Sequence, residues 1–373
     1  MKVARPDGIY INIAHLQHTA AVAEDAVRSG LYPGIVLAVA NSHQTMWTHV
    51  VPGADRHGPD SIFQIASITK PIVATAVMQL VEQGKLLLHV PVVNYLPEFR
   101  GGGRERITPF HLLTHCSGLD EQAFWEGMRA LQTTPPAGYL FEACCRVGLL
   151  FEPGSAYQYN SLSFSVLAEL VTRLSSLPYP EYLRRYIFEP LGMVDTAFSP
   201  VDRQRAAPLH DFGSDWQLEA FNSLAVAGGG LWSTSADLIA FGQAFLRALY
   251  GQGAFPHGDP GYRVLAPRTI EVMTTHYTKG KMSLQGGLPV VPFNYALGWG
   301  KPSWPPVADT LASERAFGHS GASSTLLWID PEWDLVFVFL SNRWELQDPT
   351  DTRSRALNTV YGALLRTDND NPL

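Results

Sequence analysis

The chain of 373 residues is poor in cysteine and contains no long apolar run. Its three cysteines, Cys116, Cys144 and Cys145, include one adjacent pair, a pattern unlike the disulfide framework of a secreted scaffold. We therefore expect three reduced and mostly buried thiols. The absence of a stretch of about 18 apolar residues argues against a membrane-spanning helix.

Basic residues are also scarce. The chain has 27 lysines and arginines against 34 acidic residues, a formal net charge of −7, and no basic cluster. The sequence therefore lacks the basic patch that is typical of nucleic-acid-binding proteins. Residues 1–10 lack the apolar core of a signal peptide. The simplest interpretation is a cytoplasmic protein, or a periplasmic one whose leader has been removed.

Strand patterns occur near both ends of the chain. Apolar runs at residues 34–40 and 46–51 predict an antiparallel hairpin, and those at 324–329 and 335–340 predict two further strands. A helical pattern follows at residues 351–366. The residues between these ends are mostly helical in pattern, with loops rich in proline and glycine.

These patterns favour an α/β (α+β) fold in a single catalytic unit, residues 1–373, with 46% hydrophobic residues to form its core. We expect an antiparallel sheet region built from residues 1–85 and 288–373. Helices flank the sheet, and a mainly helical region, residues 86–287, is inserted between its two parts.

A serine stands three residues before a lysine at Ser67 and Lys70, and a helical run follows at residues 72–83. Side chains at i and i+3 lie on one face of a helix, so the lysine amine can reach the serine hydroxyl. A serine becomes a good nucleophile only when a base takes its proton. Lysine can act as that base if burial or nearby positive charge lowers its pKa.

Two further short motifs come later in the chain: Tyr159-Asn160-Ser161 and His319-Ser320-Gly321. With Ser67 and Lys70 they resemble the three active-site motifs of the serine β-lactamase and penicillin-binding-protein superfamily. The most similar branch contains class C β-lactamases, D-stereospecific peptidases and family VIII carboxylesterases. Four more segments resemble that branch in the same order: residues 107–119, 191–196, 227–234 and 297–300. The resemblance implies a β-lactamase/transpeptidase-like fold with the active site between the sheet and the helical region.

The resemblance implies a role for each motif residue. Ser67 is the expected nucleophile, Lys70 the base or proton shuttle, and Tyr159 the second proton-transfer group. Which of the last two takes the serine proton stays open, and a nearby ammonium would lower the pKa of the phenol. Tyr157 is the alternative tyrosine. Tyr159 is preferred because it lies six residues after Pro153, as in the family.

Two motif positions depart from the family pattern. Ser161 stands where asparagine is usual, which leaves its contact to Lys70 or to substrate in doubt. His319 replaces a lysine, so a fixed positive charge is lost, and a histidine with an ordinary pKa of about 6.5 would become charged only in mild acid.

The remaining candidate residues would shape the substrate cleft. Ser320 and Gly321 are expected to line it with Ser161 and His319. The backbone N–H groups of Ser67 and Ala322 are the expected oxyanion hole. Two loops rich in large apolar residues, around 120–139 and 277–292, are expected to form an apolar rim.

Two other patterns are interpreted as structural. His111 and His115 have the i, i+4 spacing of zinc ligands, but no glutamate follows the first as in the metalloprotease motif. We expect no metal and no other cofactor. The run of glycines at 228–230 is expected to allow close packing beside the cleft.

The leading functional interpretation is a serine hydrolase that forms an acyl-enzyme, most simply an esterase of small esters or amides. The partners are then small-molecule esters, amides or lactams, and the sequence gives no oligomeric state. One alternative is a β-lactamase, a D-alanyl carboxypeptidase or a D-aminopeptidase. An acyltransferase and a catalytically inactive binding homologue are the others. The loss of lysine at His319 argues against a β-lactamase.

Overall fold

A five-stranded antiparallel sheet in the order β3-β2-β11-β10-β9 lies at the centre of the fold. The structure is a computed structural model that describes residues 5–55, 57–122, 135–136, 138–252, 262–285, 288–290, 294–302 and 311–366. The strands are β2 (Ile35–Ala40), β3 (Thr45–Val51), β9 (Phe317–Gly321), β10 (Thr325–Asp330) and β11 (Leu335–Leu340). Both ends of the chain therefore contribute to one sheet, as predicted.

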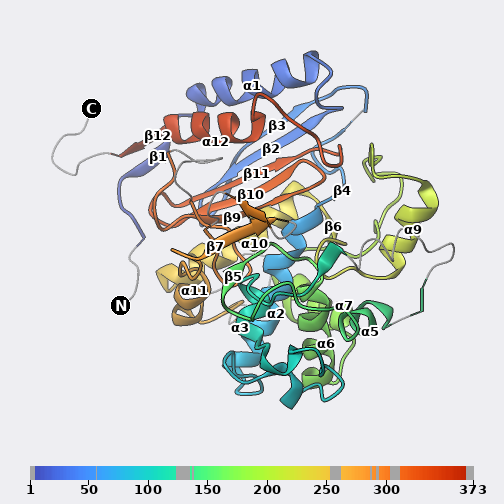
Figure 1. The fold of residues 1–373 in the computed structure, drawn as a ribbon. Coiled ribbons are helices and arrows are strands. Elements are labelled where there is room, and N and C mark those ends of the chain that lie inside the picture. Colours follow the sequence, from blue (N-terminus) through green and yellow to red (C-terminus); the bar gives the residue numbers. More distant parts are fainter. Residues whose placement is uncertain are drawn as a thin grey trace.

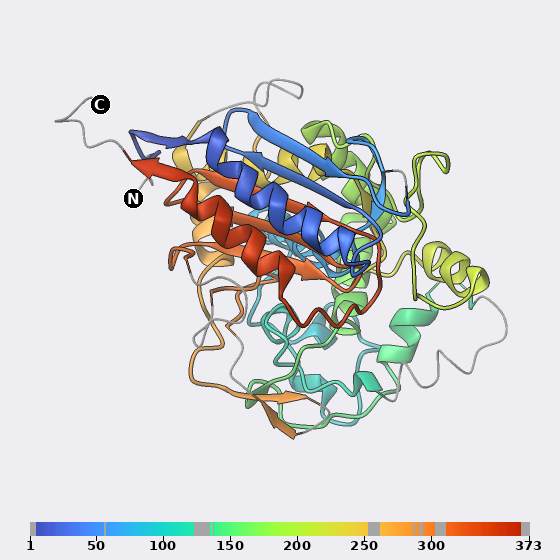
Figure 2. The same ribbon diagram turned by 90° about the horizontal axis from the view of Figure 1, so that it is seen from above.

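The two faces of the sheet pack into different cores because side chains alternate along a strand. In β2, Ile35, Leu37 and Val39 belong to one core, and Val36, Ala38 and Ala40 belong to the other. The first core is covered by α1 (Gln17–Arg28) and α12 (Thr352–Gly362), which lie side by side over the sheet in Figure 2. On the other face, α10 (Ser235–Tyr250) packs against β2 and β11.

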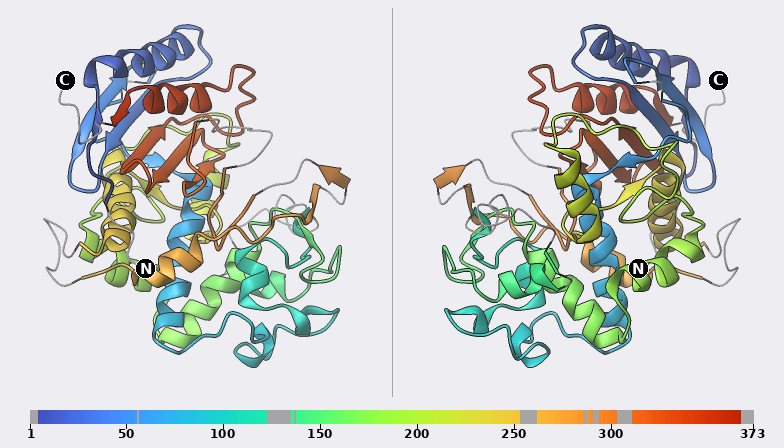
Figure 3. Two further views of the ribbon diagram at one scale, coloured as in Figure 1. Left: turned by 90° about the vertical axis from the view of Figure 1, so that its left-hand side faces the viewer. Right: turned by 90° about the vertical axis from the view of Figure 1, so that its right-hand side faces the viewer.

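Helix α2 (Thr69–Glu82) connects the sheet to the helical part of the molecule (Figure 1). Its residues 69–80 are all buried, so it forms the central support of the second core. The helical part lies below the sheet in Figure 3. It contains α3 (Pro109–Leu113), α5 (Tyr139–Cys144), α6 (Ser163–Ser175), α7 (Tyr179–Leu183) and α8 (Glu189–Leu191).

Shorter elements complete the described chain. Helices α9 (Asp215–Ser223) and α11 (Pro267–Met273) flank the sheet and the helical part. Tight 3₁₀ turns are η1 (Ile13–Leu16), η2 (Ala66–Ile68), η3 (Val92–Asn94) and η4 (Arg104–Arg106), whereas η5 (Arg184–Phe188) is a wider π-helical turn. Two small sheets pair β1 (Ile9–Ile11) with β12 (Leu364–Arg366) and β4 (Phe63–Gln64) with β6 (Trp232–Ser233). In a third, β7 (Met282–Gln285) lies between β5 (Ala156–Tyr157) and β8 (Leu288–Val290).

The prediction of one helix over residues 351–366 was wrong at its end. Helix α12 stops at Gly362, and residues 364–366 pair with β1 as strand β12. The pairing with β1 gives hydrogen-bond partners to the backbone N–H and C=O groups of these residues. It also buries Leu364 in the core beneath α1 and α12. The predicted division of the chain at residues 86 and 287 stays a prediction, although α10, from inside the predicted insertion, packs on the sheet.

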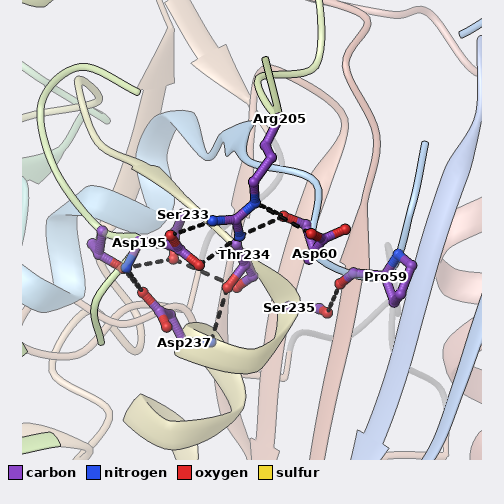
Figure 4. A network of polar contacts seen from close by, with 9 residues as sticks. Pro59, Asp60, Asp195, Arg205, Ser233, Thr234, Ser235 and Asp237 are labelled. Carbon is purple, nitrogen blue, oxygen red and sulfur yellow. Dashed lines mark hydrogen bonds and ion pairs between the residues drawn. The ribbon is translucent and has the colours of Figure 1, made fainter. Parts of the chain in front are cut away.

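A polar network ties the chain around residue 200 to helix α10 (Figure 4). Asp237 accepts hydrogen bonds from the backbone N–H of Asp195 (2.9 Å) and the Thr196 hydroxyl (2.7 Å). Arg205 forms a two-pronged ion pair with Asp195, and its Nε lies 3.3 Å from an Asp60 carboxylate oxygen. Burial raises the pKa of Asp237 to about 6. The network is thus a structural clamp.

Two further observations complete the description. All three cysteines are free thiols; Cys116 and Cys144 are buried and Cys145 is half-buried. Within the described ranges, every helix is too short or too polar to cross a bilayer.

Candidate active site

Ser67 lies in the turn η2, between β4 and α2. The preceding residue, Ala66, has a left-handed backbone with φ of 45°, a strained conformation that persists only where the surroundings hold it. Gln64 provides that hold, because its buried Oε1 accepts the N–H of Ala66 (2.7 Å) and its Nε2 donates to the Gly229 carbonyl (2.5 Å). The nucleophile turn is therefore fixed by a side chain that the sequence analysis did not identify.

Lys70 is fully buried and points at Ser67, as the i, i+3 spacing predicts. Its Nζ donates to Ser67 Oγ (3.0 Å), to Ser161 Oγ (3.0 Å) and to the Gly228 carbonyl (2.5 Å). Burial lowers the pKa of Lys70 to about 7, and the nearby charge of Glu121 acts in the opposite direction. A large fraction of the amine is therefore neutral near pH 7 and can accept a proton.

Tyr159 lies in the loop before α6, with its hydroxyl hydrogen-bonded to Ser67 and Ser161. The Lys70 Nζ is 4.7 Å from its ring centre. The residue is 37% exposed, which places it at the wall of an open site. Burial of the hydroxyl nevertheless raises the Tyr159 pKa, so the expected lowering by the ammonium is wrong. The phenol stays protonated at neutral pH.

Tyr157, the alternative tyrosine, lies elsewhere. It is buried and packs against the rings of His115 and Tyr295, with centroid distances of 5.9 and 6.1 Å. Of the two tyrosines, Tyr159 is the one whose hydroxyl is hydrogen-bonded to Ser67.

Ser161 makes the contact that its departure from asparagine had left in doubt, since its Oγ accepts from Lys70. The neighbouring Asn160 has a structural role: its Nδ2 donates to the Leu119 carbonyl (2.8 Å) and its Oδ1 accepts the backbone N–H of Ser163 (2.7 Å) at the start of α6. A hydroxyl therefore suffices beside the lysine.

Glu121 is a site residue that the sequence analysis missed. Its Oε1 accepts the backbone N–H of Ser161 (2.8 Å), and its charge raises the pKa of Lys70 and of Tyr159. No motif marks it, because it follows the matched segment 107–119 in a stretch of polar residues.

His319 is buried on β9. Its Nδ1 lies 2.7 Å from the Ser320 carbonyl, so this nitrogen carries the proton, and Nε2 accepts from the Tyr295 hydroxyl at 2.8 Å. Burial and then the charge of Lys70 lower the pKa of His319 to about 3. The expectation that His319 gains charge below about pH 6.5 is therefore wrong, because the imidazole is desolvated.

Ala322 follows β9 in the turn that brings the sheet to the nucleophile. A Cβ on Gly321 would lie 2.5 Å from the Ile65 carbonyl oxygen, so only glycine allows this approach. The Ser323 hydroxyl also donates to the Gln64 carbonyl at 2.5 Å. Ser67 and Ala322 consequently line one cavity, and their N–H groups remain the predicted oxyanion hole.

That cavity has a volume of about 510 Å³. Besides Ser67, Tyr159, Ser161 and Ala322, most of its wall comes from side chains in and around α9 and from the segment after β11. These are Asp211, Phe212, Trp216, Gln217, Ala220, Phe221, Leu224, Val226, Trp344 and Glu345, and Ala66, Pro135, Gly228 and Gly229 complete the lining. His319, Ser320 and Gly321 are not among the residues that line it, and the Ser320 side chain is exposed on β9, so the cleft role of all three stays a prediction.

The apolar rim predicted around 120–139 and 277–292 lies partly outside the described residues, namely at 123–134, 137, 286–287 and 291–292. Of the described part, Pro135 alone lines the cavity.

The histidine pair at 111 and 115 and the glycine run at 228–230, both interpreted as structural, make contacts that support the fold. His111 caps α3 together with Thr108, and His115 accepts the N–H of Asn160 at Nδ1 (3.1 Å). Across the part of the chain that the structure describes, no cluster of histidine, cysteine or acidic side chains suits a metal. A Cβ on Gly228 would lie 2.7 Å from the Ser161 carbonyl oxygen, which confirms the predicted close packing.

Comparison with known proteins agrees with the fold. The family model described as beta-lactamase matches residues 19–360. Protein Rv1367c of Mycobacterium tuberculosis is 30% identical over 321 residues, covering 75% of this chain and 77% of that protein. Esterase EstB of Burkholderia gladioli is 33% identical over 227 residues, covering 51% and 54%.

The solved structure of EstCE1, described as a hydrolase with promiscuous acyltransferase activity, superposes with a TM-score of 0.75 at 19% identity and covers 94% and 99% of the two chains. This similarity shows that the two chains share the β-lactamase/transpeptidase-like fold. The chain belongs to the beta-lactamase family.

Proposed function

We propose that this protein is a serine esterase that forms an acyl-enzyme on Ser67. The observation that carries the proposal is the buried Lys70 amine, 3.0 Å from Ser67 Oγ and with a pKa lowered to about 7. A base with a pKa near the working pH is best suited to proton transfer. The esterase EstB among the relatives adds support.

In the proposed reaction the neutral Lys70 amine takes the proton of Ser67 as Oγ forms a bond to the ester carbonyl carbon. The N–H groups of Ser67 and Ala322 stabilise the resulting oxyanion, each by about 3 kcal/mol. The bond from carbon to the alcohol oxygen then breaks. That oxygen receives one proton from Tyr159, and the protonated Lys70 replaces that proton. Water attacks the acyl-serine in the second half, releases the acid and restores Ser67.

The charge of the site favours a neutral substrate. His319 replaces the family's lysine and is uncharged at neutral pH. The cavity lining also contains no lysine or arginine among the residues that the structure describes. A β-lactam carries a carboxylate that needs a cationic partner, whereas a simple ester carries none. The β-lactamase alternative is therefore the weaker one.

The test compares p-nitrophenyl butyrate with nitrocefin between about pH 5.5 and 8. We expect a much higher kcat/KM for the ester throughout, with no relative gain for nitrocefin in acid because His319 stays neutral. The variant Ser67→Ala gives the background rate. Nitrocefin turnover equal to that of the ester would favour a β-lactamase instead.

A further inference from the structure

The cavity beside Ser67 has an aromatic wall that the proposed chemistry does not use. Phe212, Trp216, Phe221 and Trp344 line it. The ring centres of Phe212 and Trp344 are 4.7 Å apart, and those of Phe212 and Phe221 are 5.3 Å apart. Trp216 is 42% exposed at the wall, so its ring is accessible to an apolar group that enters the cavity.

The charged groups on this wall are acidic. Asp211 and Glu345 line the cavity. Asp211 is paired with Arg343 at 2.8 Å, while Glu345 is exposed. A substrate with a carboxylate on this side would meet negative charge, whereas an uncharged apolar group would gain burial.

The wall starts at the predicted oxyanion hole. The backbone N–H of Glu345 donates to the Ala322 carbonyl at 2.6 Å, which fixes Trp344 and Glu345 next to Ala322. The alcohol oxygen of an ester must face Lys70 and Tyr159 to receive its proton. The oxyanion occupies the N–H groups of Ser67 and Ala322, so the acyl chain takes the remaining direction, and the aromatic wall next to Ala322 is the apolar surface of the cavity available to it.

We propose that this wall is an acyl-binding site and that the preferred substrates are uncharged esters with a medium-length or phenyl-bearing apolar acyl group. The proposal rests on the proposed esterase function. A volume of about 510 Å³ is far more than an acetyl group fills and lies in the range of ordinary small-ligand pockets.

Two substrate series separate the acyl side from the alcohol side. In the first, p-nitrophenyl esters from acetate to octanoate vary only the acyl chain. In the second, alkyl acetates from methyl to octyl vary only the alcohol, with acid release followed by titration. We expect kcat/KM to rise about fourfold for each methylene that becomes buried in the first series and to stay nearly flat in the second.

Three variants locate the effect on the wall. Ala220 is buried in the lining of the cavity, so Ala220→Leu should fill it and lower the ratio of octanoate to acetate turnover about tenfold. Trp216→Ala should lower the same ratio by removing contact area. Leu218→Ala, an equivalent truncation on α9 at a residue that does not line the cavity, should leave the ratio as in the wild type.

The outcomes are distinct. Absence of all ester hydrolysis and of fluorophosphonate labelling would overturn the esterase function, and the acyl site with it. Ester hydrolysis that falls with acyl length, or that rises in the alcohol series instead, would overturn the acyl site alone. A ratio unchanged by Ala220→Leu and Trp216→Ala would equally contradict it.

Discussion

A single buried lysine determines the chemistry of this site. With the pKa of Lys70 lowered to about 7 by burial, its neutral form is lost as pH falls below that value. We predict that kcat/KM for a neutral ester rises with pH through an apparent pKa of about 7. Lys70→Arg keeps its proton and should lose about 10² to 10⁴ in rate. A pH profile that is flat between about 5 and 9 would contradict this role of Lys70.

Glu121 offers a way to shift that profile. Its carboxylate raises the pKa of Lys70 and holds the backbone N–H of Ser161. Glu121→Gln removes the charge and keeps an acceptor, so the rise in kcat/KM should move to lower pH. Asp120→Asn, a neighbouring change of the same kind, is the control. A shift upward, or one equal to the control's, would show that Glu121 does not act on the lysine.

Sequence reasoning found Ser67, Lys70, Tyr159 and Ser161, which the structure brings together, but not their protonation states. The i, i+3 spacing was enough to predict that Lys70 faces Ser67. The pKa directions of Tyr159 and His319 were not accessible, because both depend on burial by segments far away in the chain. Glu121 was missed for the same reason: its contact to Ser161 spans 40 positions.

At the scale of elements, the site depends on close packing of the glycine segment against the loop before α6. The Gly228 carbonyl accepts from Lys70, and a Cβ there would lie 2.9 Å from Ser161 Cβ. We predict that Gly228→Ala displaces Ser161 and lowers kcat by about 10²-fold, because small misplacements of catalytic groups are costly. Gly362→Ala, where an added Cβ meets no atom within 4 Å, should have little effect. Equal losses in the two variants would contradict the packing argument.

Elements with a strong apolar period were predictable, and those defined by their neighbours were not. Strands β10 and β11 agree with their predicted ranges to within one residue. Strand β12 was missed because three residues that pair with an edge carry no period of their own. The contribution of α9 to the cavity wall was missed because tertiary structure, and not local sequence, determines which segments line a cavity.

At the scale of the molecule, the sheet built from both chain ends must be held to the long helical segment between them. Arg205 contributes to this, because it pairs with Asp195 inside that segment and also donates to the backbone carbonyl of Asp60, in the N-terminal part of the chain, at 2.7 Å. The Arg205 and Asp195 side chains are 29% and 17% exposed. We predict that Arg205→Ala lowers the free energy of unfolding by about 1–3 kcal/mol, measured by urea denaturation. Arg203→Ala breaks a more exposed pair with Glu219 and should cost only about 0–1 kcal/mol. The reverse order would mean that the clamp is not structural.

The most direct test of the central claim is mass spectrometry of the protein after reaction with a fluorophosphonate probe. We predict one added label per chain, located on the peptide that contains Ser67, and none in a folded Ser67→Ala variant, whose turnover should fall by about 10⁶. Labelling at another serine, or labelling retained in Ser67→Ala, would contradict the assignment of Ser67 as the nucleophile.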